Sequence, residues 1–147
     1  EAIGAGRPFL GICLGLQVLF ETSREFGETR GIGHFGGEVV PFPGEMRGDN
    51  GNRLKIPHMG WNRISMAGPR EVPLLAGISD GAWLYFVHSY YVSPSEEGIA
   101  ATRTEHGVSF VSSVYRDNVF ACQFHPERSG PLGLRILGNF LDWAKGL

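Results

Sequence analysis

A cysteine flanked by glycines is the first feature of this sequence whose residue types could carry chemistry. The pentapeptide Gly11-Ile12-Cys13-Leu14-Gly15 lies where an apolar segment gives way to a helical pattern. This arrangement has the outline of a nucleophile elbow, because flanking glycines let neighbouring backbone approach a sharp, strained turn. We expect the helix N-terminus to lower the thiol pKa and the backbone N–H of Leu14 to point at a developing oxyanion. Taken alone, the pentapeptide fits a small buried cysteine equally well.

A histidine and a glutamate two residues apart form the second feature. The segment CQFHPE (122–127) ends a predicted strand, and a proline fixes the backbone between His125 and Glu127. A cysteine hydrolase needs a base that takes the thiol proton and returns it to the leaving amine, and a carboxylate that fixes the tautomer of that base. In isolation such a triplet is more often a surface turn. Combined with Cys13 it predicts a nucleophilic site of Cys13, His125 and Glu127, whereas Cys122 is expected in the core.

The remaining histidines lack the spacing of a metal site, because none has a second histidine four residues on or a cysteine at ligand spacing. No metal is therefore expected. The position of most interest is His88, which precedes Ser89 and Tyr90 at the end of an aromatic segment where backbone could line a pocket. Most of the others are expected to be structural or exposed: His34, His58 and His106.

The elements around the cysteine follow from the apolar pattern. The run PFLGIC (8–13) predicts a buried strand, and the apolar spacing over 16–26 predicts a helix that ends at Gly27. Residues 31–66 are rich in Gly, Pro and Asn and are predicted to be mostly loops. Two short strands are expected there: Glu38–Phe42 and Asn62–Met66.

The second half of the chain is expected to complete the sheet. Ala82–Val92 is dense in aromatic and β-branched residues and predicts one central strand, preceded by a short helix around Pro73–Gly77. The dipeptide at 117–118 predicts a hairpin turn. Apolar residues at helical spacing over Leu132–Trp143 predict a closing amphipathic helix on the sheet, and hence an α/β layering. Three further strands are expected: Ile99–Arg103, Ser109–Tyr115 and Val119–Phe124.

The composition limits the class of protein. The chain has 147 residues, a size typical of one domain, with 42% hydrophobic and 19% charged residues. Its formal net charge of -2 comes from scattered residues, which leaves no basic stripe for nucleic acid. No apolar run approaches the ~20 residues that span a bilayer, and the N-terminus lacks the pattern of a signal peptide. The two cysteines give no disulfide framework, which favours a reducing cytoplasm.

Three segments together resemble the class I (Triad) glutamine amidotransferases: GICLGLQ (11–17), FVHSYY (86–91) and HPE (125–127). Within that family, KIPHMGWN (55–62) followed by YFVHSYY (85–91) resembles the glutaminase subunits of imidazole glycerol phosphate synthase, which serve histidine biosynthesis. The resemblance covers essentially the whole chain, 1–147, as a single amidotransferase domain. It implies a flavodoxin-like three-layer α/β fold with a mixed central sheet.

The resemblance also implies an activity and a substrate site. Glutamine would bind beside Cys13, whose thiolate attacks the side-chain carboxamide while His125 shuttles protons and Glu127 supports the imidazole. Ammonia then leaves, water releases glutamate, and no cofactor is implied. The residues that the resemblance assigns to glutamine binding are Gly11, Leu14, Gln17, Ser89 and Tyr90. For Gln17 the alternative is an ordinary polar residue on a helix surface.

A partner follows from the same resemblance. The ammonia is expected to pass, without meeting bulk solvent, into a (β/α)8-barrel cyclase subunit that forms a heterodimer with this chain. An exposed aromatic side chain on a loop bounded by Gly and Pro would anchor such an interface, although core packing is the alternative for Trp61. The residues that fall where the family meets the cyclase are Trp61, Asn62, Tyr85 and Arg128.

One departure from the family concerns the N-terminus. Family members carry a segment before the elbow strand that supplies the first strands of the sheet and a second oxyanion donor, and this sequence has no counterpart of it. We therefore expect an N-terminally incomplete domain with low activity. Three other functions stay open: another class I amidotransferase, a γ-glutamyl hydrolase, or a non-catalytic truncated subunit that only binds a partner.

Overall fold

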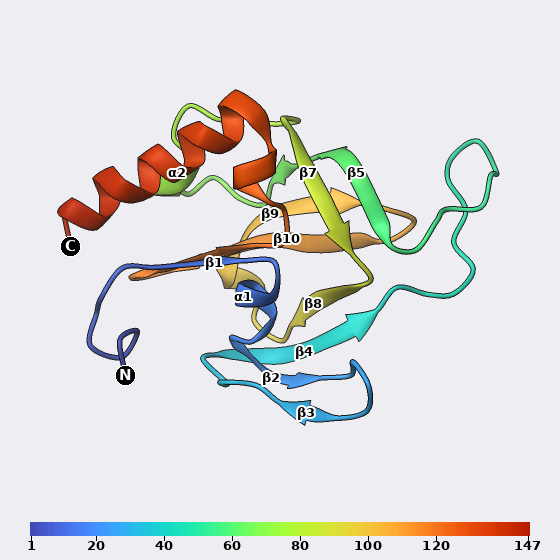
Figure 1. Ribbon diagram of the computed structural model, residues 1–147, viewed down its shortest axis with the longest axis horizontal. Coiled ribbons are helices and arrows are strands. Elements are labelled where there is room, and N and C mark those ends of the chain that lie inside the picture. Colours follow the sequence, from blue (N-terminus) through green and yellow to red (C-terminus); the bar gives the residue numbers. More distant parts are fainter.

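The computed structural model describes residues 1–147 and contains one large and one small β-sheet (Figure 1). The strands are β1 (Phe9–Ile12), β2 (Phe20–Ser23), β3 (Thr29–Arg30), β4 (Phe35–Pro41), β5 (His58–Arg63), β6 (Ser65–Met66), β7 (Trp83–His88), β8 (Tyr90–Pro94), β9 (Ala100–Glu105), β10 (Ser109–Arg116) and β11 (Val119–Cys122). The α-helices are α1 (Leu14–Gln17) and α2 (Gly130–Lys145), and the 3-10 turns are η1 (Pro73–Leu75), η2 (Glu97–Ile99) and η3 (Pro126–Arg128).

The large sheet has nine strands and mixes parallel with antiparallel pairs. Its main path runs β1-β11-β10-β8-β4-β2-β3, while β9 pairs with β10 and β6 pairs with β9. The pairs β1–β11 and β2–β4 are parallel, and the other pairs are antiparallel. The small sheet is the antiparallel pair β5–β7.

Both faces of the large sheet are covered, because strand residues alternate between two hydrophobic clusters. In β11, Phe120 packs in the cluster that contains Ile136 of α2, whereas Ala121 packs in the cluster that contains Leu16 of α1. The pair β5–β7 lies on the same side as α2 (Figure 1). The predicted α/β fold with a mixed sheet is confirmed.

The parallel pair β1–β11 determines where the two sequence motifs meet. Ile12 pairs with Cys122, so the carboxyl ends of both strands reach the same edge of the sheet. The hairpin predicted at 117–118 is confirmed, since Arg116 pairs with Val119 and Asp117 has a φ of 54°. Its turn sets the register that brings the segment after Cys122 beside the cysteine elbow.

The helix predicted over 16–26 is wrong beyond its first turn. α1 ends at Gln17, and Phe20 begins β2, which runs parallel to β4. The spacing of apolar residues fits a helix, but Phe20 is fully buried through its pairing with Phe35, whose ring centroid lies 5.8 Å away. Phe26 has a φ of 54° and is 96% exposed in the turn between β2 and β3, where Gly27 follows with a φ of 100°.

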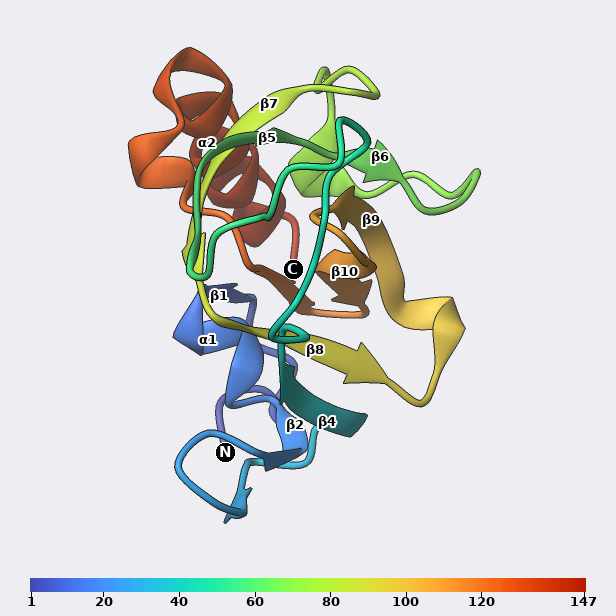
Figure 2. The same cartoon turned by 90° about the vertical axis from the view of Figure 1, so that its right-hand side faces the viewer.

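The single central strand predicted over Ala82–Val92 is also wrong, because the chain changes sheet at Ser89 (Figure 2). β7 pairs with β5 in the small sheet, and β8 pairs with β4 and β10 in the large sheet. The break is held by the Ser89 carbonyl, which accepts a hydrogen bond from the Phe42 N–H at 3.2 Å. Similarly, the strand predicted over Asn62–Met66 is two strands, β5 and β6, separated by the buried Ile64.

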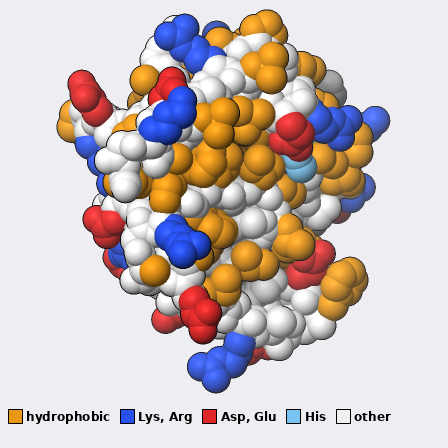
Figure 3. Space-filling view, turned by 60° about the vertical axis from the view of Figure 1, so that its left-hand side comes forward, with side chains coloured by type: hydrophobic (Ala, Val, Ile, Leu, Met, Phe, Trp, Pro, Cys, Tyr) orange, Lys and Arg blue, Asp and Glu red, His pale blue; other side chains and the backbone are white.

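The closing helix is confirmed as α2, but only one of its apolar lines faces the sheet. Ile136 is fully buried, and Phe140 and Trp143 pack against the same cluster. Leu134 and Leu141 are 67% and 60% exposed. On the face of the molecule in Figure 3, hydrophobic side chains gather in a broad patch bordered by charged ones. None of the helices combines the length and hydropathy that crossing a membrane requires.

Candidate active site

The backbone of Cys13 has the strained conformation expected of an elbow. Its φ of 53° and ψ of -103° lie outside the regions that side chains normally allow. The Cys13 N–H donates to the Cys122 carbonyl at 2.8 Å, and its carbonyl accepts from the Leu16 N–H at 3.0 Å. The end of β11 and the first turn of α1 therefore hold the cysteine in this conformation.

The two glycines that flank the elbow are not equivalent. A Cβ on Gly11 would lie 2.5 Å from the Gly15 carbonyl oxygen and 3.0 Å from the Ala121 Cβ. A Cβ on Gly15 would meet nothing within 4 Å. The expectation that both positions need a hydrogen to avoid collision is thus right for Gly11 and wrong for Gly15.

The Cys13 thiol is half-buried between β7 and β11. Its Sγ accepts from the Gln123 Nε2 at 3.5 Å and donates to the Val87 carbonyl at 3.9 Å. Burial raises the pKa of the Cys13 thiol, and the hydrogen bonds from the Leu14 N–H and Gln123 lower it by less. The expected lowering of the thiol pKa is therefore wrong, because α1 has only four residues and its dipole does not offset burial.

The imidazole of His125 is oriented by its carboxylate neighbour. The Nδ1 of His125 lies 2.5 Å from the Oε1 of Glu127, and the His125 N–H donates to the Tyr85 carbonyl at 2.8 Å. The other ring nitrogen, Nε2, is buried and has no hydrogen-bond partner. The ring therefore presents a nitrogen that could exchange a proton, and the charge of Glu127 acts on the Cys13 thiol, which places the carboxylate near it.

Gln17 and Tyr90 also meet at this edge of the sheet. The Gln17 Nε2 donates to the Tyr90 carbonyl at 3.1 Å and to the Gln123 Oε1 at 3.2 Å. Gln17 therefore faces inward, which contradicts the alternative of an ordinary helix-surface residue. Ser89 lies at the break between β7 and β8, directly before Tyr90.

Sequence reasoning missed Gln123, a fully buried side chain that joins Gln17 to the Cys13 thiol. Its only available signal was the strand register. Once Ile12 pairs with Cys122, the next residue of each strand, Cys13 and Gln123, must lie side by side.

A cavity of about 300 Å³ opens beside the elbow. We call it the elbow cavity. It carries one carboxylate, from Glu25, and one guanidinium, from Arg30, which together complement the charges of a free amino acid. Neither residue was expected in the site. The residues that line the elbow cavity are Leu14, Gln17, Val18, Ser23, Glu25, Phe26, Thr29, Arg30 and Gly31.

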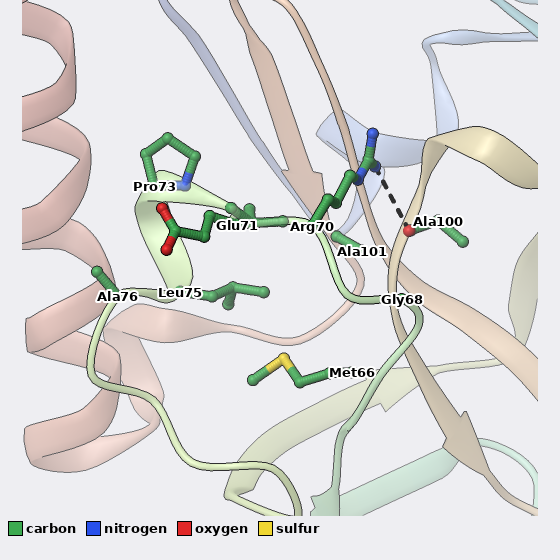
Figure 4. A pocket seen from close by; sticks show the side chains of 10 residues that line it. Met66, Gly68, Arg70, Glu71, Pro73, Leu75, Ala76, Ala100 and Ala101 are labelled. Atoms are coloured by element: carbon green, nitrogen blue, oxygen red, sulfur yellow. Dashed lines mark hydrogen bonds between the residues drawn. The ribbon is translucent and has the colours of Figure 1, made fainter.

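A second cavity, of about 500 Å³, lies between η1 and β9 (Figure 4). Its guanidinium, Arg70, donates to the carbonyls of Ile99, Ala100 and Tyr115 and so is occupied by backbone. Apart from Glu71, its other lining residues are apolar or glycine, and none is a nucleophile. This cavity is not part of the cysteine site.

Three of the four residues expected at a partner interface share one face of β5 and β7. Trp61 is 53% exposed, which excludes core packing for it. Its ring centroid lies 6.1 Å from that of Tyr85, and the Arg128 Cζ lies 4.4 Å from the Tyr85 ring centroid. Asn62 faces the other side of β5, where its Nδ2 lies 3.0 Å from the His58 Nε2, because neighbouring strand residues alternate.

Comparison with known proteins agrees with the elbow and the sheet. A model of the family described as glutamine amidotransferase class-I matches residues 1–143. The chain belongs to the class-I glutamine amidotransferase family. Solved structures with the same fold include a glutamine amidotransferase from Thermotoga maritima, with a TM-score of 0.58 and 19% identity over 99% of this chain and 52% of that one. Another, from Thermoplasma acidophilum, has a TM-score of 0.65 and 22% identity over 95% and 58%.

Within the family, the chain is similar to proteins named "Imidazole glycerol phosphate synthase subunit HisH". It is 51% identical over 140 residues to that of Syntrophotalea carbinolica, which covers 95% of this chain and 66% of the relative. For Methylococcus capsulatus the values are 50% over 139 residues, with 95% and 64% covered. For Aromatoleum aromaticum they are 48% over 145 residues, with 98% and 67% covered. The chain thus spans about two thirds of the length of these relatives, and the predicted resemblance to this subunit is confirmed.

Proposed function

We propose that this chain hydrolyses glutamine to glutamate and ammonia, with Cys13 as nucleophile, His125 as general acid and base, and Glu127 as the group that orients His125. One observation carries the proposal. A strained cysteine elbow lies at the same sheet edge as an imidazole whose Nδ1 is held by a carboxylate and whose Nε2 is buried without a partner. A buried ring nitrogen without a partner is costly, and a catalytic proton acceptor is a reason for one.

The reaction begins with proton transfer from the Cys13 thiol to the His125 Nε2. The sulfur attacks the carboxamide carbon of glutamine, and the Leu14 N–H donates to the resulting oxyanion. When the C–N bond breaks, the imidazolium returns its proton to the nitrogen, and ammonia leaves. Water then attacks the thioester while His125 takes a proton from it, and the proton returns to the sulfur as glutamate departs.

The raised pKa of the thiol defines the resting state of this site. Because burial favours the uncharged form, Cys13 waits as a thiol rather than as a thiolate. Proton transfer then accompanies attack on the substrate. The free thiol also requires reducing surroundings, and both cysteines are unpaired, which favours the cytoplasm as the place of action.

The elbow cavity supplies the binding groups for the amino-acid end of glutamine. Its carboxylate, Glu25, would pair with the substrate ammonium, and its guanidinium, Arg30, with the substrate carboxylate. Backbone at Ser89 and Tyr90 would flank the substrate, and Gln17 would hold the Tyr90 carbonyl in place. Gly11 keeps the elbow tight enough for the Leu14 N–H to face the reacting carbon.

The ammonia would pass to a cyclase partner subunit of the (β/α)8-barrel kind. The relatives' names, which make them subunits of a synthase, support a partner. The surface that supports it is the face formed by Trp61, Tyr85 and Arg128, where an exposed aromatic pair and a stacked guanidinium have the composition of an interface anchor. Asn62 would act behind this face rather than on it.

The two cysteines provide a matched test in the full-length protein. Cys13→Ser should lower glutamine turnover by at least ~1000-fold, because removing the nucleophile leaves only binding and oxyanion stabilisation. Cys122→Ser should keep turnover, because Cys122 is buried in the core. A diazoketone analogue of glutamine should label Cys13 and spare Cys122 in peptide maps. Turnover that survives Cys13→Ser would sink the proposal, and a wild-type protein that binds its partner without turnover would be a non-catalytic subunit.

A further inference from the structure

Two buried histidines face each other across the small sheet, in direct register. His58 of β5 pairs with His88 of β7, and their side chains are 4% and 6% exposed. The His58 Nδ1 lies 2.9 Å from the His88 Nε2. Neither residue touches the catalytic groups proposed above, so their burial as a pair calls for another reason.

The surrounding groups determine which nitrogen of each ring carries a proton. The His88 Nδ1 lies 2.7 Å from the Tyr90 carbonyl, and a carbonyl only accepts, so this nitrogen is the donor. In a neutral ring the His88 Nε2 is then an acceptor, and the His58 Nδ1 donates to it. The His58 Nε2 in turn accepts from the Asn62 Nδ2, whose other hydrogen goes to the Glu105 carbonyl at 2.8 Å.

Burial keeps both rings neutral, as this arrangement requires. It lowers the pKa of His58 to about 3 and that of His88 to about 4. One proton arrangement therefore satisfies every group from Asn62 to the Tyr90 carbonyl, and all the donors point toward that carbonyl.

The hydrogen bonds continue from Tyr90 to the nucleophile. The Tyr90 carbonyl also accepts from the Gln17 Nε2, which donates to the Gln123 Oε1, and the Gln123 Nε2 donates to the Cys13 Sγ. We call the set from Asn62 through the two histidines to Cys13 the histidine relay. It joins β5, whose outer face carries Trp61, to the thiol.

We propose that His58 and His88 are positioning residues, which hold the Tyr90 carbonyl and thereby the amides of Gln17 and Gln123 in the geometry that aims the Cys13 thiol. The proposal rests on the function proposed for Cys13. A carbonyl bound by two donors loses its orientation when one donor is removed, and the amides that follow it then shift. Displacements of this size at a reacting centre have large effects on rate.

The test compares His88→Phe with His106→Phe in the full-length protein. His88→Phe keeps an aromatic ring among Phe42, Phe86 and Phe110 but removes both of its relay bonds. His106 stacks on His58 at 4.1 Å and lies outside the relay, so it is the control. His88→Phe should lower kcat for glutamine roughly 10-fold to 100-fold with a smaller change in KM, whereas His106→Phe should stay within about twofold. Their melting temperatures report any loss of the fold.

A rescue variant separates positioning from packing. In His88→Asn the amide nitrogen can occupy the place of Nδ1 and donate to the Tyr90 carbonyl, so kcat should recover above that of His88→Phe despite a poorer fill of the core. Asn62→Leu breaks the relay at its outer end without emptying a buried site, and should lower kcat even if His88→Phe does not fold. Equal loss in the His88 and His106 variants, no rescue by Asn, or unchanged kcat in Asn62→Leu would overturn the proposal.

Reaction of Cys13 with iodoacetamide keeps this test apart from the test of function. The reaction needs no glutamine, so a protein without glutaminase activity would refute the proposed function and still report on the relay. We expect alkylation of Cys13 to slow in His88→Phe and to match wild type in His106→Phe. Equal alkylation rates in all three proteins would show that the histidines do not position the thiol.

Discussion

The Cys13 thiol lies between opposing influences on its pKa. Burial raises the pKa most, and the Glu127 carboxylate raises it further, whereas hydrogen bonds from the Leu14 N–H and Gln123 lower it. The net effect is a raised pKa, so the protonated form dominates at neutral pH. The reactivity of the free protein with a simple electrophile should therefore keep rising with pH beyond the usual range of a cysteine.

Replacing Gln123 with methionine tests this balance. The change removes the amide that donates to the Cys13 Sγ at 3.5 Å while keeping a side chain of similar length. The thiolate loses a hydrogen bond, so its pKa rises and the iodoacetamide rate near about pH 8 should fall about 5-fold to 10-fold. Above the thiol pKa the two proteins should react equally fast. A constant ratio at every pH would mean that Gln123 controls access to the sulfur instead.

Individual residues were predictable where their own chemistry marks them. Cys13, with its glycines, and the pair His125 and Glu127 could be chosen because few other roles need those types at that spacing. Gln123 could not, because its place beside the thiol depends on the parallel register of two strands more than a hundred residues apart. Asn62 was assigned to the wrong face because the limits of β5 were not known.

Among the elements, those that depend on local pattern were found and those that depend on distant pairing were not. The hairpin at 117–118 and the helix α2 follow from turn residues and helical spacing. β2 was taken for helix because its apolar residues fit that spacing, and only its pairing with Phe35 of β4 makes it a strand. The break at Ser89 was missed because β7 and β8 have the same composition but join different sheets.

The contact between α2 and η3 depends on a glycine and gives a prediction at this scale. A Cβ on Gly133 would lie 1.9 Å from the Pro126 carbonyl oxygen, in the turn that carries Glu127, whereas a Cβ on Gly138 would meet nothing within 4 Å. Gly133→Ala should destabilise the protein by about 1 to 3 kcal/mol and lower glutamine turnover, since α2 must move off η3. Gly138→Ala should stabilise it by up to ~1 kcal/mol.

Urea unfolding measures both glycine variants. The two substitutions add the same methyl group to the same helix, so helix propensity favours both equally and the difference between them reports the contact with η3 alone. Similar midpoints for Gly133→Ala and Gly138→Ala would show that α2 does not depend on this close approach.

The whole molecule is expected to lose stability in acid because of the buried histidine pair. Burial, followed by the neighbouring imidazoles His88 and His106, lowers the pKa of His58 to about 3; burial also lowers the pKa of His88 to about 4, although its bond to the Tyr90 carbonyl opposes this. The ordinary value is 6.5. Below that pH the unfolded chain binds protons that the folded protein does not, so stability is present above about 6.5 and is lost as the pH falls toward the folded values.

The free energy of unfolding of wild type and His88→Phe, measured at about pH 7 and about pH 5, tests this linkage. Wild type should lose about 2 kcal/mol for each buried histidine over this interval. His88→Phe removes one of the two titrating groups, so its loss should be smaller by about 2 kcal/mol, while the contribution of the carboxylates is common to both proteins and cancels. The ring resonances of His58 and His88 in the wild type should stay unchanged over the same interval. Equal losses in the two proteins, or a titration of either ring near its ordinary pKa, would show that the pair is not kept neutral by the fold and that the relay has no fixed proton arrangement.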